Sequence, residues 1–197
     1  MRLSIRRAVW LCSLTLAALA SATTQANADD AKTTDVKIKD ITLSVPSGWK
    51  KEEPKTRLRL AQFSVPAAEG DKESAELAIF SFGASDPSAN IRRWLSQFQA
   101  KDRKASVATG VSAVGKYVFV DISGTYNKPV GPPVAGKTEP TPNSRVLAVI
   151  LVAEKKGVYY LKMAGPDKTV AAQADALRKS FGGDAEKEKV VDTEKKQ

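Results

Sequence analysis

The chain has 197 residues, of which 31 are lysine or arginine and 22 are aspartate or glutamate, so its formal charge at pH 7 is +9. It contains no histidine and a single cysteine, Cys12. These absences exclude serine–histidine–acid catalysis. Once Cys12 is removed, they also exclude cysteine nucleophiles and zinc sites built from nitrogen or sulfur ligands. We therefore expect a protein that is not an enzyme and that uses no metal and no cofactor.

Residues 1–28 are typical of a cleaved secretory signal peptide. Arginines at the start are followed by an apolar run over residues 8–20 and then by small residues. We expect cleavage after Ala28, with cleavage after Ala22 as the alternative. The apolar run is shorter than the roughly 20 residues of a membrane-spanning helix, so we expect no transmembrane span. The remaining chain carries 28 basic and 22 acidic side chains, a formal charge of +6, and we expect it to be secreted or periplasmic.

Alternating polar and apolar residues, rich in β-branched and aromatic types, predict six strands. They lie at residues 36–45, 57–65, 75–82, 116–126, 145–153 and 158–164. The fifth strand is apolar on both faces, so we expect it in the centre of the sheet. The short turn that follows it predicts an antiparallel hairpin with the sixth strand.

Two helices are predicted among these strands. The first follows residues 85–88 and places four apolar side chains, from Ile91 to Phe98, on one stripe. The second follows residues 165–167 and ends at Gly182. Because each apolar stripe needs a sheet face to cover, the fold class that we expect is α+β, a three-layer α/β/α sandwich with a mostly antiparallel sheet of about six strands.

The order of these features resembles a known superfamily. A first strand leads into Val45-Pro46-Ser47-Gly48-Trp49, strands follow up to Phe82, a helix carries Trp94, and Gly165-Pro166 opens a last helix that ends at Phe181. This order is similar to that of the photosystem II extrinsic PsbP and Mog1-like fold. Members are mostly noncatalytic binding or assembly proteins with unrelated partners, so the resemblance implies a binding or accessory role without naming a partner.

Residues 35–181 are predicted to form a single domain, and the polar residues 182–197 are predicted to be a disordered tail whose removal has little effect on stability. Within the domain, residues 127–144 are predicted to be a proline-rich surface loop. Residues 131–138 match the phosphate-binding loop of nucleotide hydrolases, but two adjacent prolines there have no amide hydrogens to offer a phosphate. We therefore reject nucleotide binding.

Two basic clusters supply the candidate binding residues. They are Arg57 and Arg59 in the first cluster, and Arg92 and Arg93 in the second. Trp49 is a fifth candidate, because it follows a turn and either plugs the end of the sheet or stands in a binding surface. Nucleic acid is not an expected partner, since no recognition motif accompanies the charge. The alternative to a binding role is that nearby acidic side chains neutralise both clusters.

Asp121 lies inside a predicted strand and has two interpretations. It is either a buried general acid with a raised pKa, or a residue that is partly exposed or paired with a nearby lysine or arginine. The function that we expect is that of an exported, noncatalytic binding or accessory protein of the cell envelope, acting as a monomer on an unknown protein or anionic envelope component. The alternatives are an electrostatic binder of anionic envelope polymers or lipid headgroups, and a carboxylate-dependent hydrolase that uses Asp121.

Overall fold

The structure is a computed structural model and describes residues 32–83, 86–131 and 135–191. The strands are β1 (Thr33–Ile38), β2 (Ile41–Pro46), β3 (Lys50–Glu52), β4 (Arg59–Val65), β5 (Ala75–Phe82), β6 (Lys104–Val111), β7 (Gly115–Pro129), β8 (Thr138–Ala153), β9 (Gly157–Pro166) and β10 (Lys189–Val191). The helices are α1 (Pro87–Leu95), α2 (Asp167–Ala171), α3 (Ala174–Ser180) and a short 3₁₀ helix at Ala185–Lys187. The expected signal peptide lies outside the described residues.

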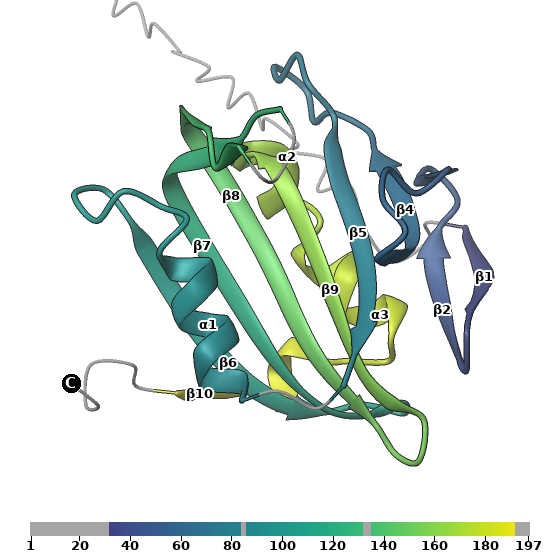
Figure 1. The fold of residues 1–197 in the computed structure, drawn as a ribbon. Coiled ribbons are helices and arrows are strands. Elements are labelled where there is room, and N and C mark those ends of the chain that lie inside the picture. Colours follow the sequence, from purple (N-terminus) through teal and green to yellow (C-terminus); the bar gives the residue numbers. More distant parts are fainter. Residues whose placement is uncertain (1–31, 84–85, 132–134, 192–197) are drawn as a thin grey trace, which may run out of the picture. The chain divides into compact units, whose positions relative to one another are not determined.

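Eight strands form one sheet in the order β10-β6-β7-β8-β9-β5-β4-β3, and β1 and β2 form a separate hairpin (Figure 1). Every neighbouring pair is antiparallel. The prediction of an α+β fold with a mostly antiparallel sheet is therefore confirmed, but the sheet has eight strands rather than about six. The extra strands β3, β6 and β10 bury few side chains, and β3 and β10 have only three residues each, so alternation does not reveal them.

The first predicted strand, 36–45, is in fact two strands. The chain reverses at Lys39 and Asp40, where Lys39 has a φ of 55°, and Ile38 pairs with Ile41 across the turn. Both strands place their apolar side chains on one face. The alternation changes from even-numbered residues in β1 to odd-numbered residues in β2, and this change of phase, which the single predicted strand overlooked, marks the turn.

Residues 127–129 and 138–144 form paired strands and not the predicted loop. Strand β7 continues to Pro129 and β8 begins at Thr138, and these two residues pair. The prolines are tolerated because β9 ends opposite Ser144, which leaves one side of this part of β8 without a neighbouring strand. The long hairpin therefore extends beyond the rest of the sheet.

The prediction of a disordered tail from residue 182 is wrong for residues 182–191. Strand β10 pairs with β6, and the Glu188 carboxylate accepts hydrogen bonds from Arg178 Nε at 2.8 Å and Arg178 Nη2 at 3.0 Å. The Tyr117 hydroxyl donates to the same carboxylate at 3.1 Å. Strand pairing and charged contacts hold this segment, so its low content of apolar residues is a poor guide to its order.

Two hydrophobic clusters lie on opposite faces of the sheet. Strand β8 supplies both: Leu147 belongs to the cluster that contains α2, α3 and the β1–β2 hairpin, whereas Val146 belongs to the cluster that contains Trp94 of α1. Figure 1 shows α1 on one side of the sheet and α2 and α3 on the other. The prediction of a fully buried central strand at 145–153 holds along most of its length, although Val152 is 45% exposed.

The predicted first helix forms, and the second is interrupted. Asp86 caps α1 by accepting hydrogen bonds from the amides of Ser88 and Ala89 at 2.9 and 3.2 Å. The second helix is divided between Ala171 and Ala174 into α2 and α3. None of the helices in the described part of the chain has the length and apolar character needed to cross a membrane.

Candidate ligand-binding surface

The sheet face that carries α1, here called the α1 face, is only partly covered by that helix. Trp94 and the following Phe98 are buried between helix and sheet. By contrast, Phe82 and Val152 on the same face are each 45% exposed. An exposed apolar area on a folded domain marks a place where a ligand or partner can bind.

An aromatic row crosses this exposed part of the α1 face. Phe80 stacks with Phe82 at a centroid distance of 5.7 Å, and Phe82 lies 5.8 Å from Tyr160. Phe80 and Tyr160 are direct partners on β5 and β9, and Tyr160 is in turn paired with Ile150 on β8. The apolar contacts therefore run across three strands, although Tyr160 and Ile150 are themselves buried.

Beside this row, the face is hollowed over β6, β7 and β8. The hollow has a volume of about 470 Å³ and is lined by Pro87, Thr109, Gly110, Val111, Lys116, Tyr117, Val118, Ile150, Val152, Lys187 and Lys189. This volume lies within the range of roughly 300–1,000 Å³ of ligand pockets. Apolar side chains of the sheet and the first residue of α1 line it together with three lysines.

The lysines of the hollow are largely uncompensated. Lys187 forms an ion pair with Asp184 at 2.9 Å. Neither Lys116 nor Lys189 has an acidic partner within the described ranges. Because Lys187 and Lys189 belong to the carboxyl-terminal segment that docks on β6, the folding of that segment completes the basic side of the hollow.

A second hollow, of about 610 Å³, lies where three turns meet at one end of the sheet. Asp40, Ser112 and Glu154 are among its lining residues, and it shares Val111 and Lys116 with the first hollow. Turn residues of both charge signs line it, so it lacks the continuous apolar floor of the first. We therefore place the candidate site on the α1 face.

Lys162 is the most unusual polar side chain on the α1 face. It projects between the buried Ala78 and Ala148, its partners on β5 and β8. Its ammonium group donates to Gln97 Oε1 at 2.6 Å and to the Tyr126 hydroxyl at 3.1 Å. Burial lowers the pKa of Lys162 to about 8, and the charges of nearby Arg93 and Arg59 act in the same direction.

The acceptor Gln97 is held in place by the backbone around it. The Gln97 carbonyl accepts from the Asn127 amide at 2.8 Å, and the neighbouring Gln99 amide donates to the Thr125 carbonyl at 2.9 Å. These bonds fix the segment after α1 to β7. The contact between Gln97 and Lys162 is thus anchored by main-chain hydrogen bonds on both sides.

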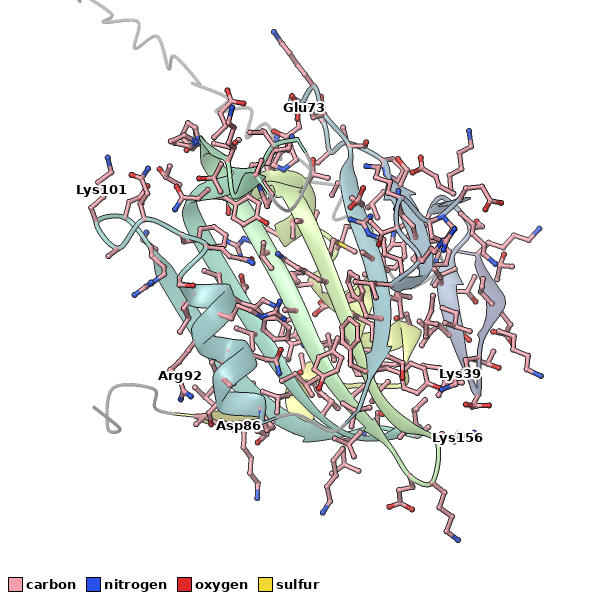
Figure 2. The ribbon with its side chains drawn as sticks, viewed as in Figure 1. Lys39, Glu73, Asp86, Arg92, Lys101 and Lys156 are labelled. Carbon is pink, nitrogen blue, oxygen red and sulfur yellow. The ribbon has the colours of Figure 1, made fainter. Side chains whose placement is uncertain are left out.

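Two of the predicted binding arginines, Arg59 and Arg93, are near enough for their charges to act on Lys162. Arg59 donates to Glu76 at 2.7 Å and lies over the Phe80 ring, and Arg93 donates to Asn90 at 2.9 Å. Arg57 is exposed, with no ion-pair partner within the described ranges. Arg92 lies 3.7 Å from Asp86 on α1 (Figure 2). Each basic cluster therefore contributes one arginine to the surroundings of Lys162: Arg59 from the first cluster and Arg93 from the second.

Local neutralisation of the first cluster comes from Glu76. Burial opposes ionisation of this carboxylate, but contacts with Lys55 and Arg59 outweigh that effect, so the pKa of Glu76 is lowered. Glu52, an acidic neighbour of this cluster in the sequence, instead accepts a hydrogen bond from Gln62 at 3.0 Å. One acidic side chain thus serves both Lys55 and Arg59.

Trp49 lies in the core and not on a binding surface. Its side chain is 5% exposed and packs in the cluster with α2 and α3, and its indole donates to Gln173 Oε1 at 3.1 Å. Of the two interpretations offered by the sequence, the one in which the ring plugs the end of the sheet agrees with this position.

Asp121 lies on the face opposite α1 and is the partner of an arginine. Arg145 donates to Asp121 through Nη1 and to Asp167 through Nε, both at 2.8 Å. Burial raises the pKa of Asp121 although Arg145 lowers it. The sequence offered a raised pKa and an arginine partner as alternatives, and the structure combines them.

Sequence reasoning did not single out Lys162, Lys116, Lys187 or Lys189. For Lys162 a signal was present, because it interrupts the apolar face that Tyr160 and Ala164 share in an alternating strand. The lysines of the hollow gave no such signal, since each is an ordinary surface residue until β6, β7 and β10 bring them together.

No protein-family model matches the sequence, and no curated protein is significantly similar to it. Among solved structures, the chain is similar to cyanobacterial PsbP (CyanoP) from Synechocystis, with 12% identity, a TM-score of 0.46, and coverage of 84% of this chain and 96% of that one. It is also similar to LpqN, involved in cell envelope biogenesis of Mycobacterium tuberculosis, with 13% identity, a TM-score of 0.42, and coverage of 84% and 88%. The resemblance to PsbP-like proteins expected from the order of sequence features is thus found, at the level of the fold alone.

Proposed function

We propose that the chain is an exported, noncatalytic binding protein whose α1 face holds an anionic amphiphile, a molecule with an apolar chain and an acidic headgroup. The observation that carries this proposal is the hollow of about 470 Å³, which combines an apolar floor with Lys116, Lys187 and Lys189. The apolar chain binds along Val118, Ile150 and Val152, and the acidic group binds the lysines.

Charge complementarity favours this ligand over a second copy of the chain. Residues 35–181 carry 23 basic and 15 acidic side chains, a formal charge of +8. Two such chains repel each other, whereas the same charge attracts an anion. The apolar floor, in turn, favours an amphiphile over a purely polar polyanion, which would leave that floor exposed to water.

A pair of matched ligands tests the proposal by calorimetric titration. Decanoate and decanol share an apolar chain and differ in the charged group, so decanoate should bind at least about tenfold more tightly if the lysines contribute one charge-assisted contact. Val152→Glu places an acidic group at the hollow and should weaken decanoate binding by a similar factor.

Val190→Glu is the control variant. Val190 is 81% exposed and pairs with Ala108, which in turn pairs with Phe119 of the opposite face. The same new charge is therefore introduced on β10 but away from the hollow. Equal decanoate affinity in Val152→Glu and Val190→Glu would refute the proposal. Dimerisation through the α1 face would refute it too; sedimentation would then show a dimer in the wild-type protein that is lost in Val152→Glu.

A further inference from the structure

Lys162 is a partly buried cation, and the described residues leave it without a carboxylate in contact. Its three close contacts are the Gln97 amide oxygen, the Tyr126 hydroxyl and the face of the Tyr126 ring, whose centroid lies 5.2 Å away. All three are neutral. A buried ammonium group is costly unless an anion accompanies it, so this arrangement favours a negative group supplied from outside the chain.

Two further cations surround the same position. Arg93, from α1, and Arg59, from β4, are both near enough for their charges to act on Lys162. The hydrogen bond from Arg93 Nη2 goes to the neutral oxygen of Asn90. Glu76 is the nearby acidic group, and it already binds Arg59 and Lys55. Positive charge therefore exceeds negative charge around Lys162.

The aromatic row borders this cluster. Tyr160 precedes Lys162 by two residues on β9 and so shares its face, and Phe80 lies beneath the guanidinium of Arg59 at 6.0 Å. A group attached to an anion at Lys162 would thus lie near Phe80, the partly exposed ring of this pair. Arginine and lysine together suit an oxyanion with several acceptor oxygens, because the guanidinium donates in a planar fork and the ammonium acts as a point charge.

We propose that Lys162, Arg93 and Arg59 form a receptor for a phosphate or sulfate group, separate from the hollow on the same face. The bound oxyanion accepts hydrogen bonds from the three cations and supplies the negative charge that Lys162 lacks. This proposal goes beyond the amphiphile site, because it uses none of the lysines of the hollow and is tested by substitutions at different residues.

Binding at this receptor depends on pH through Lys162. With a pKa of about 8 in the free protein, Lys162 is charged at pH 7 and neutral at pH 10, so oxyanion affinity falls as the pH rises through 8. The groups that face it do not follow this change: burial and Glu76 raise the pKa of Tyr126, the pKa of Glu76 is lowered, and arginine stays charged.

The test is titration with sulfate, whose charge is constant over this range, at pH 7 and pH 10 and constant ionic strength. Sulfate should bind about tenfold more weakly at pH 10, the loss of one charge-assisted contact. Lys162→Met should lose the same factor at pH 7. Lys162→Arg should keep binding and lose the pH dependence, because its charge is permanent. Circular dichroism checks that each variant is folded.

Lys101→Met is the matched control, because Lys101 is exposed in the connection between α1 and β6 (Figure 2) and should leave sulfate binding unchanged. Phenyl phosphate and inorganic phosphate distinguish the source of the group: tighter binding of phenyl phosphate assigns the receptor to an ester, and equal binding assigns it to the free anion. Equal sulfate affinity in the wild type and Lys162→Met, or a pH dependence that persists in Lys162→Arg, would overturn the proposal. Neither result would bear on decanoate binding at the hollow.

Discussion

At the scale of single residues, one arginine bridges two acids. Arg145 binds Asp121 and Asp167 on the face opposite α1, and its own side chain is 23% exposed. Burial already raises the pKa of Asp121 in the presence of this arginine. Without Arg145, both carboxylates would lose their cation while Asp121 would remain partly buried.

We expect Arg145→Met to lower the free energy of unfolding at pH 7 by about 2 kcal/mol, as for other charged contacts removed on one side. Because the folded-state pKa of Asp121 is raised, ionisation of this group costs stability above that pKa, and it costs more without Arg145. The difference between variant and wild type should therefore grow as the pH rises from 3 to 7. Urea unfolding measures it, and Arg57→Met, at an exposed arginine, should change stability by less than about 0.5 kcal/mol.

At the scale of elements, the carboxyl-terminal segment is part of the fold and of the hollow. It forms β10, supplies Lys187 and Lys189, and places Glu188 between Arg178 and Tyr117. Arg178 also lies over the Phe119 ring, at 3.6 Å from its centroid. The loss of Glu188 would therefore leave a largely buried guanidinium group without its carboxylate partner.

Truncation after Gly183 should therefore destabilise the protein, contrary to what the composition of the segment predicts. The loss of strand pairing and of the Arg178–Glu188 contact should lower the melting temperature by about 5–10 °C, since 1 kcal/mol corresponds to about 2–4 °C at this size. Truncation after Val191 keeps both features and is the control. A shift below about 2 °C for the shorter chain would show that the segment contributes little.

At the scale of the whole molecule, excess positive charge affects the rate at which an anionic ligand encounters the protein more than it affects the contacts in the bound complex. The charge of +8 over residues 35–181 attracts anions over distances that salt shortens, with a Debye length of about 8 Å near physiological ionic strength. Contacts inside the hollow are closer than this distance, so salt affects them less.

Stopped-flow measurements with a fluorescent anionic amphiphile should separate the two effects. The association rate should fall about tenfold between roughly 20 mM and 500 mM salt, as for steered encounters, whereas the dissociation rate should change little. Val152→Glu should increase the dissociation rate. Association that is insensitive to salt would contradict a steering role for the net charge.

The sequence by itself determined the fold class, because apolar alternation and helical stripes report which faces are buried, and the strands at 57–65, 75–82 and 158–164 follow directly from that signal. It also excluded histidine-dependent chemistry, since composition does not depend on folding. Among the candidate residues, it marked Arg59 and Arg93 by charge. It did not show that these two are the members of their clusters that approach Lys162.

Only the tertiary structure decided where the strands without an apolar pattern lie and which side chains meet. Strands β6 and β10 are held by backbone pairing, and any residue except proline supplies the amide and carbonyl groups on which pairing depends. The hollow arises from the same cause, because Lys116, Lys187 and Lys189 become neighbours through strand order and not through spacing in the sequence. Lys162 is an exposed lysine in any extended chain, and only the fold makes it a partly buried cation that donates hydrogen bonds to Gln97 and Tyr126.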